Sequence, residues 1–218
     1  MVIGRLDAIR RYPVKSLSPE RLDAVEVAAD GIPGDRAEAF FVRGGSSSVA
    51  LSREGKPYRG KDNDRLHRIG DTNAARASAA EHGADVELRE GEHFFDDAPV
   101  SILIDRWLDD LSAHAGYQVE WQRFRPNFFV RAAEGFAQSE SDLVGTVLQL
   151  GSVTMRATSP NARCVVVTYH PERPENDPEI LRYIAQHREN IMGIYCEVLQ
   201  PGVARVGDEL KTNERGVA

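Results

Sequence analysis

A succession of short apolar segments separated by turn residues limits this chain more than any other feature. Pairs such as Asp30-Gly31 and Pro201-Gly202 separate the segments, because glycine tolerates unusual backbone angles and proline fixes φ. So many short strands are typical of a β-barrel or a β-sandwich. The segments that we expect to form strands are residues 2–14, 22–28, 37–42, 86–89, 119–124, 128–132, 146–150, 153–158, 164–169, 192–199 and 203–206.

Two other segments have the periodicity of helices. Apolar residues recur at helical spacing from Leu103 to Leu111, and Gly116 follows where a left-handed cap would end a helix. Asp177 and Pro178 suit the N-cap and the first position of a second helix, ahead of an apolar face. We therefore expect helices that pack on the outside of the strands.

The pattern as a whole predicts a mainly β fold with peripheral helices, in the α+β class. Residues 53–76 are polar, charged and weakly periodic, so they are interpreted as a long surface excursion. A short helix is expected at residues 74–81.

Charge and composition narrow the choice of partners. The 218 residues have a formal net charge of −7, which argues against a general nucleic-acid surface. An anionic ligand would therefore have to be bound by a few focused cations. The apolar stretches are too short for a signal peptide or a membrane span, and the two cysteines lack metal-site spacing. A cytoplasmic protein with no membrane or nucleic-acid partner is expected.

The two cysteines occur in different patterns. Cys196 shares the apolar face of a predicted strand with Ile194 and Val198, so we interpret it as core packing. Cys164 follows a polar turn, directly after Arg163. A nearby cation favours the thiolate, the form that binds metals and attacks electrophiles. From this segment alone, packing within the core remains the favoured interpretation of Cys164.

Cationic residues form a second pattern. In an extended strand, Arg123, Arg125 and Asn127 would lie on one face, where two guanidinium groups and an amide can hold a phosphate. A solvated surface face is the alternative interpretation of that segment. Other polar or cationic residues follow a predicted strand or a double turn, namely Lys15, Ser16 and Arg36.

Taken together, these segments resemble the MOSC superfamily, in particular the group that includes the mitochondrial amidoxime-reducing component and its bacterial relatives. Each motif is weak alone, but their order and spacing along nearly the whole chain are specific. The motifs that carry the resemblance are Tyr12-Pro-Val-Lys-Ser16, Gly34-Asp-Arg36, Asp97-Ala-Pro99, Arg123-Phe-Arg-Pro-Asn127, Arg163-Cys164, Gly193-Ile-Tyr195 and Val206-Gly-Asp208.

The resemblance implies a MOSC-type β-barrel at residues 96–212, preceded by an N-terminal β subdomain at residues 1–95. It also implies a molybdenum cofactor, in which molybdenum is bound to a pyranopterin, with Cys164 as metal ligand and catalytic residue. The activity would be an oxidoreductase that reduces small N-hydroxylated substrates. The residues that would hold the pterin and its phosphate are Lys15, Ser16, Arg36, Arg125, Asn127 and Arg163.

This chain departs from the family at Ala162, where relatives often have a serine, so we expect one cofactor contact to be lost or moved to Ser159 or Asn161. It carries no appended ferredoxin domain up to Ala218, so electrons are expected from a separate donor protein. Three alternatives stay open. The first is a carrier of the cofactor or of a persulfide sulfur on Cys164, the second a non-catalytic anion-binding module, and the third a pyridoxal phosphate site.

Overall fold

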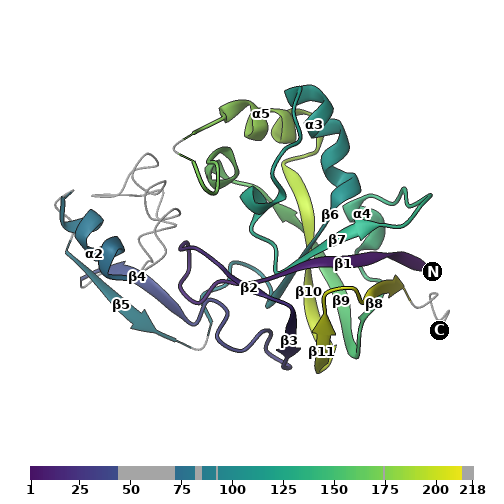
Figure 1. The fold of residues 1–218 in the computed structure, drawn as a ribbon, viewed down its shortest axis with the longest axis horizontal. Helices are drawn as coiled ribbons and strands as arrows, with labels where there is room; N and C mark the ends of the chain where they lie inside the picture. The colour runs from purple at the N-terminus through teal and green to yellow at the C-terminus, as the bar shows by residue number, and fades with distance from the viewer. Residues whose placement is uncertain (44–71, 82–84, 92, 174, 213–218) are drawn as a thin grey trace.

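A closed barrel of seven β-strands forms the body of the protein in the computed structural model (Figure 1). The structure describes residues 1–43, 72–81, 85–91, 93–173 and 175–212. The barrel strands are β1 (Val2–Arg11), β6 (Val100–Ile104), β7 (Phe128–Ala132), β8 (Val147–Leu150), β9 (Val153–Ala162), β10 (Ile191–Gln200) and β12 (Glu209–Thr212). Their order is β12-β8-β9-β10-β6-β7-β1, and β1 pairs with β12 to close the ring. The predicted mainly β class is confirmed.

One connection in the barrel brings helical structure with it. Strands β6 and β7 are parallel neighbours, so the chain must cross over between them. The crossover contains η2 (Asp105–Leu108), α3 (Asp109–Ala115) and η3 (Trp121–Phe124). Between β9 and β10 lie η4 (Val165–Thr168) and α5 (Pro178–His187), and α5 contacts α3 at one end of the barrel (Figure 1). A further single turn is α4 (Glu140–Leu143).

Smaller pairings extend the barrel. Strand β2 (Glu20–Leu22) pairs with β1, and β3 (Ala24–Val27) pairs with β11 (Gly202–Arg205). Strands β4 (Glu38–Val42) and β5 (Val86–Glu90) pair with each other and carry α2 (Thr72–Glu81), apart from the barrel at the left of Figure 1. Strand β1 therefore completes a barrel made otherwise of later strands, so the barrel takes residues from both sides of the predicted boundary at residue 95.

Two apolar cores hold these parts together. The main core fills the barrel with side chains such as Leu6, Phe128 and Ile194, each at most 1% exposed. A second cluster joins the β4–β5 pair and α2 to the segment after β1, and consists of Val14, Leu17, Phe40, Ala75, Ala79 and Val86. Because the second core contacts the residues just after β1, it positions Lys15 and Ser16 between the barrel and the outlying sheet.

The residues predicted to begin and end the helices are confirmed in those positions. Asp177 caps α5 by accepting a hydrogen bond from the Glu179 backbone N–H at 3.0 Å, and Pro178 occupies the first turn. Gly116 ends α3 in the left-handed conformation, at φ 76°. Helix α2 includes the predicted helix at residues 74–81, whereas residues 53–71 of the expected excursion lie outside the described residues. No helix in the described part of the chain is long and apolar enough to cross a membrane.

Three predictions of local structure are wrong. The segments 119–124 and 164–169 contain the 3-10 turns η3 and η4 rather than strands. The expected helix from Leu103 begins only after β6, which includes Leu103 as a fully buried strand residue. The reason is the same in each case, because a short apolar run is compatible with a buried strand or a buried turn. Strand β12 was not predicted.

Candidate functional site

A cavity of about 90 Å³ lies where β9 leads into η4, and it brings together most of the predicted site residues. Its walls come from the segment after β1, the turn before β4, the segment between η3 and β7, the end of β9 and the start of η4. The lining residues are Lys15, Ser16, Arg36, Asp96, Ser101, Arg123, Phe124, Arg125, Asn161, Ala162, Arg163, Cys164, Val166, Val167 and Tyr195.

Cys164 is the cysteine that lines this cavity. Strand β9 ends at Ala162, and Cys164 is the extended residue before η4, at φ −126° and ψ −177°. Its side chain is partly exposed and lines the cavity. Cys196 is fully buried in the main core, and this burial raises the pKa of its thiol. The interpretation of Cys196 as core packing is confirmed, and Cys164 is the thiol that a ligand can reach.

Carbonyl oxygens, and no salt-bridged carboxylate of the described residues, surround the Arg163 guanidinium. Its guanidinium donates to the carbonyl oxygen of Met192, with Nε at 2.6 Å, and Nη1 donates to the Phe124 carbonyl oxygen at 3.0 Å. None of the carboxylates in the described residues lies within salt-bridge distance of it. Burial lowers the pKa of Arg163 to about 10. A cation held against carbonyl oxygens beside a cavity suits an anionic ligand.

Arg125 is a second cation of this kind. Its Nη2 donates to the Leu17 carbonyl oxygen at 2.7 Å, and its guanidinium lies 4.3 Å from the centre of the Tyr12 ring. Burial again lowers the pKa to about 10, and none of the described carboxylates pairs with this side chain. Arg125 and Arg163 therefore both offer charge to the same cavity.

Arg36 and Lys15 differ from Arg125 and Arg163, because each of them has a carboxylate partner. Arg36 pairs with the buried Asp35, whose other oxygen accepts the Tyr12 backbone N–H at 2.7 Å. Lys15 Nζ lies 2.8 Å from Asp96 Oδ1, and the Asp96 side chain is 58% exposed against 13% for Lys15. An exposed carboxylate can move away at little cost, so Lys15 remains available to a ligand.

Backbone strain is concentrated around the cavity. Ser16, Arg36 and Arg125 line it with φ of 74°, 50° and 51°, a region that side-chain-bearing residues rarely occupy. The other two such residues in the described part of the chain are Glu189 and Asn190. Asn190 fixes Arg163 by exchanging two hydrogen bonds with its backbone, at 2.8 and 2.9 Å. Strain of this kind is characteristic of functional sites.

The predicted phosphate-binding face was wrong in its geometry. Residues 121–124 form η3, and Arg125 is left-handed, so Arg123, Arg125 and Asn127 do not share an extended face. Arg123 pairs with Glu120 at 2.8 Å and donates to the Thr168 carbonyl oxygen at 3.0 Å. It lines the cavity with its charge already compensated.

Asn127 lies in the wall behind the cavity. Its Oδ1 accepts hydrogen bonds from the Ser101 backbone N–H at 3.1 Å and from the Ser101 hydroxyl at 3.0 Å. Its Nδ2 donates to the Arg10 carbonyl oxygen at 3.3 Å. The amide thus joins β6 to β1, and Asn127 is not among the lining residues.

Asn161 is the site residue that sequence reasoning reached only as an alternative. It is 3% exposed and lines the cavity, yet its amide has no hydrogen-bond partner within the described residues. An amide that lines a cavity without a protein partner can hydrogen-bond to a ligand there. The place of Asn161 on the strand before Cys164 was the available signal. Asp96 and Tyr195 also line the cavity. Tyr195 belongs to a motif of the family resemblance but was not predicted as a site residue, and no sequence pattern identified Asp96.

The donor set suits an anionic cofactor that brings most of its own metal ligands. In the described parts of the chain, no three His, Cys, Asp or Glu side chains gather to hold a metal ion. A metal at Cys164 would therefore need its other ligands from the cofactor, and a pyranopterin dithiolene supplies soft sulfur of that kind. Its phosphate would meet the uncompensated charges of Arg125 and Arg163.

Barrel and cavity together define a β-barrel protein with a cationic, cysteine-bearing ligand site. The family model of the MOSC domain matches residues 89–211. The chain belongs to the MOSC family, which is associated with molybdenum-cofactor binding.

A solved structure with low sequence identity shows the same fold. The YuaD protein from Bacillus subtilis is 17% identical, with a TM-score of 0.56, and the match covers 95% of this chain and 94% of that one. YiiM from Escherichia coli is 12% identical with a TM-score of 0.47, over 97% of this chain and 70% of that one. No curated protein matches the chain.

Proposed function

We propose that this protein is an oxidoreductase that holds a molybdenum-pyranopterin cofactor in the Cys164 cavity. The observation that carries the proposal is the pair of partly buried guanidinium groups, Arg125 and Arg163, that face this cavity without a carboxylate partner among the described residues. Membership of a family associated with molybdenum-cofactor binding supports it independently.

Each part of the cavity has a role in this proposal. The Cys164 thiolate would ligate the metal, and Arg125 and Arg163 would hold the phosphate through charge-assisted hydrogen bonds. Lys15, released from the exposed Asp96, would add a third cation. Asn161 would direct its amide to the polar edge of the pterin. Because these groups come from separate elements of the barrel, the fold would keep them in place before the cofactor arrives.

The bound cofactor would supply oxygen-atom transfer coupled to two electrons. The protein would orient the substrate next to Cys164 and limit the access of water. The preferred substrates are small N-hydroxylated compounds such as amidoximes, with electrons from a separate donor protein. Nothing on the barrel identifies that donor, so this part of the proposal is carried by the family resemblance.

The test is to produce the full chain in a host that makes the molybdenum cofactor and, in parallel, in one that cannot. We expect molybdenum and pterin near one per chain from the first host only, measured by elemental analysis and by pterin fluorescence after acid oxidation. The loaded protein should reduce benzamidoxime with reduced viologen as electron donor. Folded protein from the competent host with neither molybdenum nor pterin would refute the proposal and favour a persulfide carrier or an anion-binding module. Loaded protein without turnover would favour a cofactor carrier.

A further inference from the structure

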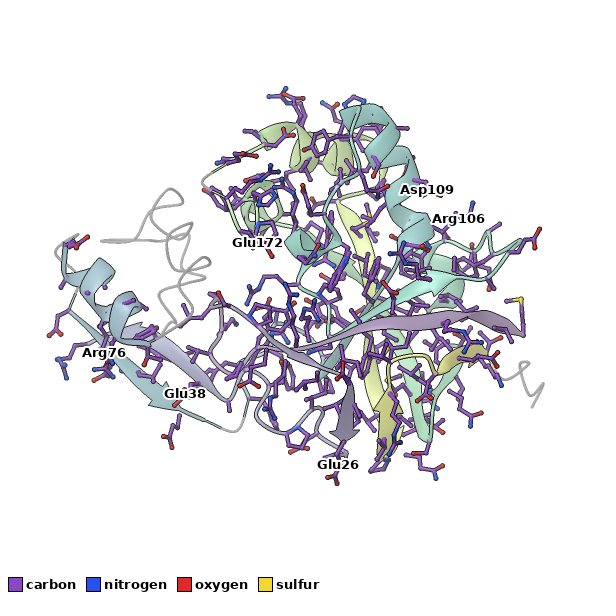
Figure 2. All side chains as sticks on the ribbon, viewed as in Figure 1. Glu26, Glu38, Arg76, Arg106, Asp109 and Glu172 are labelled. Atoms are coloured by element: carbon purple, nitrogen blue, oxygen red, sulfur yellow. The ribbon has the colours of Figure 1, made fainter. Side chains whose placement is uncertain are left out.

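A second cavity, of about 210 Å³, adjoins the Cys164 cavity. The two share Arg123, Arg125 and Val166 in their walls. The second cavity lies against the end of β1, η3 and the loop between η4 and α5, where Figure 2 shows Glu172. A molecule bound there would be next to the Cys164 cavity without displacing the groups that surround the thiol.

Arg10 lines this second cavity and supplies a positive charge to it. The side chain lies 9% exposed on β1, and its guanidinium covers the Trp121 ring at 5.0 Å. Its only hydrogen bond to the described residues runs from Nη1 to the carbonyl oxygen of Ile9, at 3.0 Å. Burial and the neighbouring charge of Arg21 lower its pKa. A guanidinium with two nitrogens unpaired beside a cavity can bind an oxyanion in bidentate fashion.

The carboxylates near this cavity do not satisfy Arg10. Glu172 lines the cavity but pairs with Arg21 at 3.6 Å, and both side chains are mostly exposed. Glu120, the residue before η3, pairs with Arg123 at 2.8 Å. The charge on Arg10 therefore remains for a ligand.

Part of the wall is apolar, and consists of Pro19, Val166 and Pro171 with the rings of Tyr12 and Tyr169. The other lining residues are polar or charged, among them Arg21, Gln122 and His170. Inorganic anions are strongly hydrated and gain little from such a surface, whereas an organic acid can bury its body there. The second cavity thus combines an oxyanion site with room for an apolar group.

We infer that this second cavity binds a small organic acid, with its carboxylate on Arg10 and its apolar body against Val166 and the two prolines. That such an acid, carrying an N-hydroxyl group, is the substrate of the Cys164 site rests on the proposed function. The binding itself does not, because Arg10 and its cavity exist without a cofactor.

Isothermal titration calorimetry with a matched pair of ligands tests the inference. Benzoate and benzamide share a shape and differ in charge, and both are titrated into cofactor-free protein at constant ionic strength. We expect one benzoate site and affinity for benzamide lower by about tenfold or more. Trp121, which lies beneath Arg10, should change its fluorescence on benzoate addition. Equal affinities for the two ligands would overturn the inference.

Variants locate the site. Arg10→Gln should lower benzoate affinity to that of benzamide, and Arg10→Lys should retain part of it. The control, Arg106→Gln, changes an exposed arginine beside α3 (Figure 2) and should bind like the wild type. Thermal melts confirm that each variant is folded. Benzoate affinity that is unchanged in Arg10→Gln would overturn the assignment, and the ligand pair on the wild type decides the question if that variant does not fold.

Cofactor-loaded protein supplies the last comparison. Benzoate should bind it as tightly as it binds the cofactor-free form. Loss of benzoate binding on loading would show that the cofactor itself occupies this cavity and would refute a separate acid site. Protein that never takes up molybdenum would refute the proposed function while leaving the cofactor-free titrations fully interpretable.

Discussion

Removing the guanidinium of Arg125 should separate ligand binding from folding. Within the described residues this group makes one hydrogen bond, to the Leu17 carbonyl oxygen, and it covers the Tyr12 ring. A phosphate in the Cys164 cavity would gain a charge-assisted hydrogen bond from it, a contact whose loss costs about 1.5–3 kcal/mol. Arg125→Ala should therefore weaken cofactor retention by roughly 10- to 150-fold.

The free energy of unfolding should change far less. Lowering the Arg125 pKa from 12.5 to about 10 means that the folded state disfavours the charged group at neutral pH. At about 1.4 kcal/mol per pH unit, and discounted because the group is partly exposed, relief of that burial gives about 1–2 kcal/mol. The lost hydrogen bond and cation–π contact cost a similar amount, about 1–2 kcal/mol. We expect a net change within about 1 kcal/mol.

Arg123→Ala is the matched control, because Arg123 lines the same cavity but already pairs with Glu120. Its loss should destabilise the fold by about 2 kcal/mol, less than a fully buried pair would cost, because Glu120 keeps its contacts with Arg173 and His170. Molybdenum per chain after extended dialysis, with melting curves on the same samples, measures both effects. Retention that is equal in both variants, or a fold that only Arg125→Ala destroys, would refute the reasoning.

Three further predictions concern the cysteines, Asn161 and Gly193. Cys164→Ser should lose molybdenum and turnover with little change in the melting temperature, whereas Cys196→Ser should keep the metal and lose roughly 1–3 kcal/mol of stability to a buried hydroxyl. Metal content and thermal melts of both variants measure these effects. A Cys164→Ser protein that retains its full metal content would refute the assignment of Cys164 as ligand. Asn161→Ala should change the stability of the cofactor-free protein by less than about 1 kcal/mol and should weaken cofactor retention, because its amide lines the cavity and has no partner among the described residues. Unchanged retention would show that the amide does not reach the ligand. Gly193→Ala should destabilise the fold by about 3 kcal/mol and disturb Arg163, because a Cβ would lie 2.9 Å from the Ile102 carbonyl oxygen and 3.0 Å from Arg163 Nη2. Gly207→Ala, with a similar φ of 97° and nothing within 4 Å, should lose only about 1 kcal/mol in the same denaturant titration, and equal losses would show that the close contact is unimportant.

Local signals predicted the parts of this protein that depend on neighbouring residues. Asp177 and Pro178 placed the start of α5, and Gly116 placed the end of α3, because capping involves residues within a few positions of each other. Alternation of apolar residues likewise predicted the burial of Cys196. The segment around Cys164 by itself favoured core packing, and only the family resemblance indicated a ligand site there.

Local sequence patterns predicted the wrong element where a short apolar run is compatible with either a strand or a turn. The residues around Val165 have the composition of a strand but form the 3-10 turn η4. Strand β12 is short and polar at both ends, and it becomes a strand because β1 and β8 pair with its two edges. Neither partner is near it in the sequence, so no local pattern could have indicated it.

The functional site shows the same division between what neighbouring residues determine and what distant residues determine. By itself the sequence determined which residue types were available, a thiol after an arginine and several cations near turns, and the motif order carried the family resemblance. Only the tertiary structure decided how each is used. It placed the Asn127 amide in hydrogen bonds with Ser101, and left the Asn161 amide open to the cavity. It also gave Arg123 a carboxylate that Arg125 lacks. Hydrogen-bond partners and burial arise from residues far apart in the chain, so the same side chain can be structural or free to bind depending on what the fold brings beside it.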